Sequence, residues 1–191
     1  MSLNVPNILT LFRLLAAPFV AWLLISDLDR FGQVLALIVF LVAAITDYLD
    51  GYLARLLDQS TTLGKILDPI ADKAMVILTL SFLSYSFDDY WNKLSYGVPA
   101  ILIIFREIFV SSLREYIGKD SKLLTVTTLS KWKTSLQLFA IGVLLLGRID
   151  GTKFFFITEV GLFLLWVSTI VTLKTGADYL RKVLLDLKEQ E

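Results

Sequence analysis

The sequence lacks two residue types that many enzymes use, since none of its 191 residues is cysteine or histidine. Their absence excludes disulfides, thiol nucleophiles, Ser-His-Asp triads, phosphohistidine intermediates and zinc sites built from cysteine or histidine. Any metal that this chain binds must therefore be held by oxygen ligands. Any general base must be an aspartate, glutamate, lysine or tyrosine.

The sequence also lacks an excess of charge of either sign. Lys+Arg and Asp+Glu both number 18, so the net charge is zero and no nucleic-acid partner is indicated. Only 19% of the residues are charged and 56% are hydrophobic, whereas soluble proteins have about 25% charged residues. This composition favours a membrane protein, and the length favours a single domain over residues 1–191.

Long uncharged runs are missing as well. The longest, Phe31–Thr46, has 16 residues, whereas an isolated transmembrane helix needs about 18. Six such runs nevertheless recur, and Val34–Ile45 is apolar throughout, which leaves no solvated face. The pattern predicts an all-α integral membrane protein whose six transmembrane helices include charged residues at their ends. We expect the spans near Val5–Ile25, Phe31–Leu57, Asp68–Phe87, Tyr96–Arg114, Lys131–Gly147 and Phe154–Leu180.

Positive charges are distributed unevenly between the two sides of these spans. The chain ends and the even-numbered connections, with the adjoining helix ends, hold 14 of the 18 lysines and arginines. The positive-inside rule therefore predicts that both termini are cytoplasmic. Nearly all ionisable residues of the spans then fall in the cytoplasmic halves, and Glu159 is the exception. Because charged side chains in membrane helices normally face a cavity or one another, we expect a polar cavity there, although Lys131 and Lys174 have stems long enough to reach water.

Four aspartates form the most informative pattern. Asp47 and Asp50 are three positions apart, and Asp68 and Asp72 are four apart, so each pair shares one helix face. A short connection near Asp58–Leu67 predicts that the two helices are antiparallel neighbours, with both pairs at the same depth. Clustered carboxylates repel one another, and a hard divalent cation such as Mg²⁺, Mn²⁺ or Ca²⁺ would relieve that repulsion.

Two small residues follow the second aspartate on nearly the same helical surface. Gly51 and Ala54 would allow a ligand to approach the backbone closely, but small residues equally serve helix packing in membranes. Their position beside a carboxylate cluster and Arg55 favours a bound phosphate or nucleotide.

The residues from Asp47 to Asp72 read D-x2-D-G-x2-A-R-x8-G-x3-D-x3-D, and this motif resembles the signature of the CDP-alcohol phosphotransferases. Members of that family are six-helix membrane enzymes in which an alcohol displaces CMP from a CDP-linked alcohol. The resemblance implies that Asp47, Asp50, Asp68 and Asp72 bind one or two divalent ions, Mg²⁺ or Mn²⁺, and that Asp72 deprotonates the attacking hydroxyl. The residues that it implies for CDP binding are Asn7, Thr10, Arg13, Gly51, Ala54, Arg55 and Thr61.

A second resemblance concerns the acceptor. The segments Arg106–Glu115 and Lys131–Thr134 are similar to the bacterial branch of the family that makes phosphatidylglycerol phosphate. This similarity implies CDP-diacylglycerol and glycerol 3-phosphate as substrates, membrane lipids as surroundings, a homodimer, and a multi-pass protein of the inner (cytoplasmic) membrane whose active site faces the cytoplasm.

The spacing of the basic residues gives independent support for a phosphorylated acceptor. Arg106 and Arg114 are eight positions apart, about two turns on one face, and with Lys131 and Lys133 they suit a phosphate. Alternatively, Arg106 pairs with Glu107 or with lipid headgroups. The other functions that stay open are a family member using inositol phosphate or a phospholipid as acceptor, and a transporter or channel whose intramembrane carboxylates bind a cation.

Overall fold

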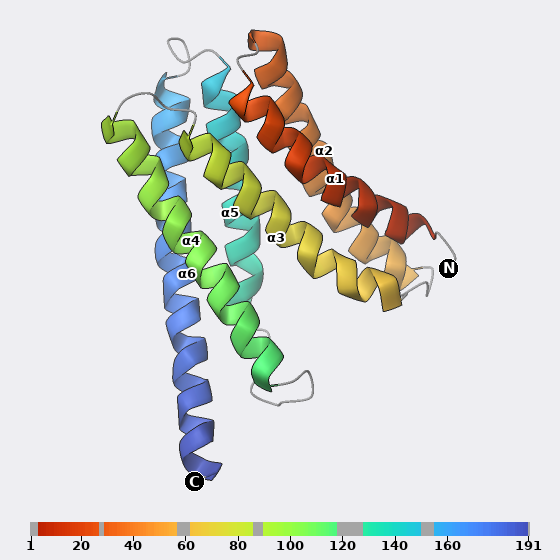
Figure 1. Ribbon diagram of the computed structural model, residues 1–191, viewed down its shortest axis with the longest axis vertical. Helices are drawn as coiled ribbons and strands as arrows, with labels where there is room; N and C mark the ends of the chain where they lie inside the picture. The colour runs from red at the N-terminus through yellow and green to blue at the C-terminus, as the bar shows by residue number, and fades with distance from the viewer. Residues whose placement is uncertain are drawn as a thin grey trace.

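The computed structural model describes residues 4–26, 29–56, 62–85, 90–117, 128–149 and 155–190, and all of its regular structure there is helical (Figure 1). The helices are α1 (Val5–Ile25), α2 (Arg30–Leu56), α3 (Thr62–Tyr85), α4 (Tyr90–Ile117), α5 (Thr128–Arg148) and α6 (Phe155–Gln190).

The expected helix bounds hold best near the N-terminus. The first expected span coincides with α1. The third does not, because α3 already begins at Thr62, which places Asp68 and Asp72 inside the helix instead of at its start. The connection before α3 is correspondingly shorter than the expected loop near Asp58–Leu67. At the C-terminus, α6 continues ten residues beyond Leu180 to Gln190.

Four helices within the described ranges are long and apolar enough to cross a membrane: Asn7–Ile25, Arg30–Asp47, Tyr90–Tyr116 and Phe156–Lys188. The chain is thus an all-α membrane protein, as its composition predicted. The other two helices, α3 and α5, carry charges well inside their bounds, such as Asp72 and Lys133. Six membrane spans therefore stay a prediction.

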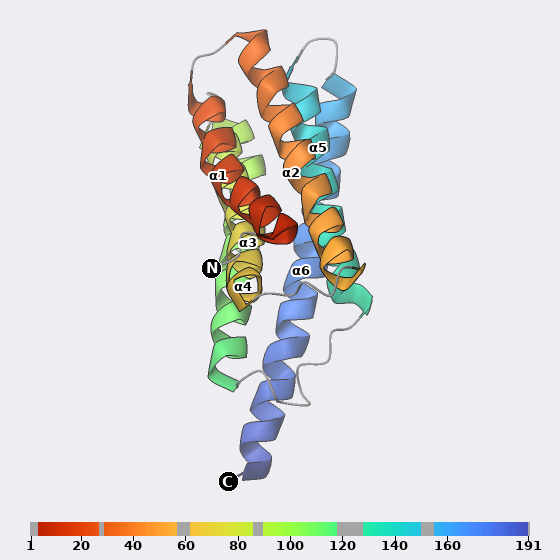
Figure 2. The same ribbon diagram turned by 90° about the vertical axis from the view of Figure 1, so that its right-hand side faces the viewer.

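The described helices form two groups, one centred on α1 and the other on α6 (Figures 1 and 2). Helix α1 packs against both α2 and α3, and α6 packs against both α4 and α5. Contacts of α3 with α4 and of α2 with α5 join these two groups. The C-terminal part of α6 extends past the ends of the other helices (Figure 2). The expectation that α2 and α3 would be antiparallel neighbours is wrong for the described residues, because each packs mainly against α1 instead of against the other.

The core contains large side chains between small ones. Alanines such as Ala17, Ala36 and Ala140 are fully buried at the helix contacts, where they allow the backbones to approach closely. The larger buried side chains that fill the remaining space are Val20, Phe40, Leu80, Leu83, Ile103, Ile141, Leu145 and Leu165.

Helices α5 and α6 approach each other closely beside Gly161. A methyl group added there would lie 2.7 Å from Cδ2 of Leu144 and 3.1 Å from its backbone nitrogen. Since backbone cannot give way as a side-chain end can, this glycine is required by packing.

We expect Gly161→Ala to lower the thermal stability of the purified protein in detergent, because overpacking a close contact costs about 1–3 kcal/mol. The matched control is Gly142→Ala, since a methyl group there would make only an ordinary contact of 3.7 Å with Leu41. Equal melting temperatures for the two variants would contradict the packing role of Gly161.

Candidate active site

The first polar cluster is centred on Arg13 of α1, and only 1% of this residue is exposed to solvent. Its Nη1 forms ion pairs with Asp47 of α2 and Asp72 of α3. Its Nη2 lies 3.6 Å from Oδ1 of Asp68. One turn earlier on α1, the hydroxyl of Thr10 donates a hydrogen bond to the same Asp68 oxygen at 2.6 Å. Three carboxylates from two helices thus converge on a single guanidinium.

The face of α1 that carries this cluster is polar at three successive turns. Asn7, Thr10 and Arg13 recur every third residue, and all three are buried. Because polar side chains on an apolar membrane helix face the protein interior, this spacing turns the polar stripe toward α2 and α3. These three are also the α1 residues that the sequence assigned to CDP binding.

A cavity adjoins the cluster, with Arg13, Asp47 and Asp72 in its wall. The remaining wall comes from apolar residues of α2 and α3 and from α5. These residues are Ala43, Ala44, Met75, Val76, Thr134 and Leu138. The carboxylates of Asp47 and Asp72 therefore border a small cavity.

Part of the predicted site falls on side chains outside the described set. Gly51, Ala54 and Arg55 follow Asp50 within α2, but only the backbone is described at these four positions, and Thr61 lies outside the described residues altogether. Among the described side chains, no three acidic residues gather closely enough to hold one metal ion. The aspartate quartet thus stays a prediction as a ligand set.

The chemistry of the cluster fits a divalent ion. Three carboxylates face one guanidinium, so acidic groups outnumber the cation and offer only oxygen donors to a ligand. Asp50 lies three positions after Asp47 on α2, which places it on the same helix face. Hard oxygen donors with this residual charge suit Mg²⁺ or Mn²⁺.

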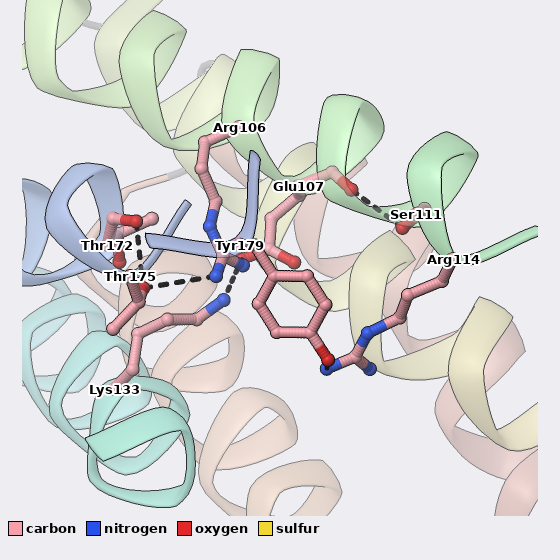
Figure 3. A network of polar contacts seen from close by, with 8 residues as sticks. All are labelled: Arg106, Glu107, Ser111, Arg114, Lys133, Thr172, Thr175 and Tyr179. Atoms are coloured by element: carbon pink, nitrogen blue, oxygen red, sulfur yellow. Dashed lines mark hydrogen bonds and ion pairs between the residues drawn. The ribbon is translucent and has the colours of Figure 1, made fainter. Parts of the chain in front are cut away.

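The second polar cluster joins α4, α5 and α6 (Figure 3). Glu107 of α4 accepts a hydrogen bond through Oε1 from Nη1 of Arg106 at 3.2 Å, and the same oxygen pairs with Nζ of Lys133 on α5. Nη2 of Arg106 donates to the hydroxyl of Thr175 on α6 at 3.1 Å. Arg106 and Lys133 are buried, so Glu107 neutralises part of a cationic cluster that has little access to water.

Arg114 lies two turns further along α4 and is exposed. Its Nη2 donates to the hydroxyl of Tyr179 at 3.1 Å, and its guanidinium carbon lies 5.1 Å from the centre of that ring (Figure 3). Three of the four cations predicted for the acceptor phosphate thus lie around the junction of α4, α5 and α6. The side chain of the fourth, Lys131, lies outside the described set.

The predictions made from the sequence missed part of this second cluster. The alternative pairing of Arg106 with Glu107 is present, but Glu107 was not expected to bridge to Lys133 as well. Thr175 and Tyr179 were not proposed at all, because the last span carries no motif. A hydroxyl at each position, one turn apart on a long helix, was the only available signal.

Comparison with known proteins identifies the family. Residues 3–174 match the model of the CDP-alcohol phosphatidyltransferase family. The chain belongs to this family. The resemblance inferred from the aspartate motif is thereby confirmed, and the matched range includes Arg13, the aspartates, Arg106 and Lys133. Enzymes of this family generally use divalent metals, which agrees with the oxygen donors around Arg13.

Curated relatives share the full length of the chain. A protein of Cereibacter sphaeroides named CDP-diacylglycerol–glycerol-3-phosphate 3-phosphatidyltransferase is 40% identical over 100% of both chains. Proteins of the same name from Wigglesworthia glossinidia brevipalpis and Shigella flexneri are 40% and 36% identical, over 94% and 100% of both chains. These similarities favour the enzyme over the transporter or channel.

The aspartates of this CDP-alcohol phosphatidyltransferase are predicted to bind a metal ion. Asp47→Asn, Asp68→Asn and Asp72→Asn should then each lower turnover by about 10²-fold or more, because that is the usual loss when one strong transition-state stabiliser is removed. Steady-state rates of the purified variants measure this. Asp58→Asn, at a variable position of the motif between the two aspartate pairs, is the control and should retain activity. Equal damage from Asp58→Asn and Asp68→Asn would refute the assignment.

Proposed function

We propose that this chain transfers the phosphatidyl group of CDP-diacylglycerol to glycerol 3-phosphate, which gives phosphatidylglycerol phosphate and CMP. The observation that carries the proposal is the presence of two clusters of opposite charge in one membrane bundle. The carboxylates around Arg13 suit a metal-bound pyrophosphate, and the cations around Glu107 suit a second phosphate. The names of the full-length relatives support the same two substrates.

The donor binds, in this proposal, beside α1 and α2. Asn7, Thr10 and Arg13 line the nucleotide site from α1. The proposed contacts from α2 and the connection after it are Gly51, Ala54, Arg55 and Thr61. One or two divalent ions, Mg²⁺ or Mn²⁺, would be held by Asp47, Asp50, Asp68 and Asp72. Bound there, they would supply neutralisation of the pyrophosphate charge.

The reaction itself needs one bond exchange and one proton acceptor. The acceptor hydroxyl oxygen bonds to the phosphorus that carries diacylglycerol, and the bond from that phosphorus to the oxygen of CMP breaks. Asp72 takes the hydroxyl proton. This carboxylate pairs with Arg13 and borders the cavity, so it acts by its position.

Arg106, Arg114, Lys131 and Lys133 are proposed to hold the phosphate of the acceptor. Arginine suits this task since its planar fork can bind two phosphate oxygens at once. Glu107 pairs with Lys133 and with one donor of Arg106. An arriving phosphate would share these cations with Glu107, which keeps them from being buried without a counter-charge.

The site is proposed to face the cytoplasm, with six spans, both termini inside, and the protein in the inner membrane as a homodimer. Glycerol 3-phosphate and CMP are charged and water-soluble, so a site at the cytoplasmic face exchanges both without crossing the membrane. The uneven distribution of lysine and arginine supports this orientation.

The direct test is product identification with purified protein in nanodiscs. With CDP-diacylglycerol, glycerol 3-phosphate and Mg²⁺ present, we expect stoichiometric CMP and a lipid carrying the mass of phosphatidylglycerol phosphate. Inositol phosphate and phosphatidylglycerol are the competing acceptors to be supplied in parallel. Transfer to one of them, with none to glycerol 3-phosphate, would refute the proposed acceptor.

The orientation is tested with two single cysteines on α4, since the natural chain has none. Asn92 and Glu115 are both exposed and lie near opposite ends of that helix. On intact cells, a membrane-impermeant thiol reagent should label the Asn92→Cys variant and spare Glu115→Cys, and both should react after the cells are lysed. The reverse labelling would place the site on the other side of the membrane.

A further inference from the structure

The C-terminal part of α6 contacts both arginines of the second cluster. Thr175 and Tyr179 make hydrogen bonds to Arg106 and Arg114, and Gly176 lies against the stem of Arg106. All three residues lie beyond residue 174, where the match to the family ends. The reaction proposed above assigns no role to this segment.

The hydroxyl of Thr175 is oriented to accept a hydrogen bond from Arg106. This hydroxyl donates its own proton to the carbonyl of Thr172 at 2.9 Å, which leaves an oxygen lone pair for Nη2 of Arg106 at 3.1 Å. Figure 3 shows this chain of hydrogen bonds from α6 to α4. Because Thr175 is buried, water does not compete for either bond.

Gly176 allows Arg106 to lie along α6. A methyl group at this position would be 3.0 Å from Cγ and 3.2 Å from Nε of Arg106. Nε has no hydrogen-bond partner within the described part of the chain, and it is enclosed. The guanidinium is therefore fixed by contact with α6 on one side and by Glu107 on another.

Tyr179 fixes the second arginine in a comparable way. Its hydroxyl accepts from Nη2 of Arg114 while its ring lies beneath the guanidinium, 5.1 Å away. Stacking and hydrogen bonding together restrict an exposed side chain that would otherwise lose about 2 kcal/mol of rotamer entropy when a ligand binds.

We infer that Thr175, Gly176 and Tyr179 are positioning residues that set the affinity for the phosphate of the acceptor, because they hold Arg106 and Arg114 in their binding orientation before the acceptor arrives. The inference rests on the proposed function, since it gives these arginines the acceptor as their ligand. A preorganised guanidinium binds phosphate more tightly because less freedom is lost on binding. Donor binding and the chemical step do not depend on α6 in this scheme.

The test compares Thr175→Val with Thr169→Val in a two-substrate kinetic matrix. Both threonines are buried on α6 and bond to their own helix, but within the described residues only Thr175 also reaches Arg106. We expect Thr175→Val to raise KM for glycerol 3-phosphate about tenfold, the scale of one lost hydrogen bond to a charged group. The kcat and the KM for CDP-diacylglycerol should stay near the wild-type values, and Thr175→Ser should restore the acceptor KM.

Gly176→Ala provides a second, independent test, with Gly97→Ala on α4 as its control because nothing lies within 4 Å of a methyl group there. Gly176→Ala should raise the acceptor KM and Gly97→Ala should not. If Thr175→Val fails to fold, Gly176→Ala still decides the matter. In the Arg106→Lys background the effect of Thr175→Val should disappear, since the shorter fork-less side chain no longer presents Nη2.

The outcomes separate this inference from the proposed function. If the wild-type protein forms no lipid from glycerol 3-phosphate, the proposed function fails before any variant is compared. If the wild type is active and the folded Thr175→Val and Gly176→Ala variants keep a normal acceptor KM, the positioning role is overturned. It is also overturned if kcat and both KM values change together, because that pattern indicates a general structural defect.

Discussion

The buried ion pairs of Arg13 organise the N-terminal half of the bundle. A charged side chain within a membrane helix costs about 2.5–3.5 kcal/mol on insertion scales, and this one is too deeply enclosed to reach water along its stem. It is neutralised only if carboxylates from other helices come to it, and Asp47 and Asp72 do so from α2 and α3. The packing of α1 against both helices is the consequence. The site and the fold are thus set by the same contacts.

Because Arg13 pairs with both helices, the prediction that α2 and α3 pack on each other is wrong, yet their aspartates still come together. A short connection favours direct packing of consecutive helices, but the charge on Arg13 brings α1 to both of them. The two aspartate helices still present their carboxylates at one depth, because Asp47 and Asp72 reach the same nitrogen. The sequence does not show that α1 packs against both helices, because that requires knowing which residue pairs with each buried charge.

Residue patterns alone predicted the all-α membrane class, the bounds of α1, and the family through the motif from Asp47 to Asp72. Burial of Asn7, Thr10 and Arg13 follows from their spacing of three on an apolar helix. The contacts of α6 could not be foreseen, since Thr175 and Tyr179 belong to no motif and act through a partner 65 or more positions away. Long-range pairs of this kind depend on which helices become neighbours, and local propensity carries no information about that.

The two clusters differ in their balance of acidic and basic side chains, and the ligands proposed for them follow this difference. Around Arg13, three carboxylates face one cation, so acidic groups outnumber the cation there. In the second cluster, Arg106 and Lys133 pair with Glu107, and Arg114 lies two turns further along α4 against Tyr179, so cations outnumber carboxylates there. In the proposed function, a metal ion and a phosphate would each relieve the repulsion between like charges in its cluster. The electrostatic repulsion that builds up where like charges gather inside a membrane protein would thus favour the oppositely charged ligands proposed for each cluster.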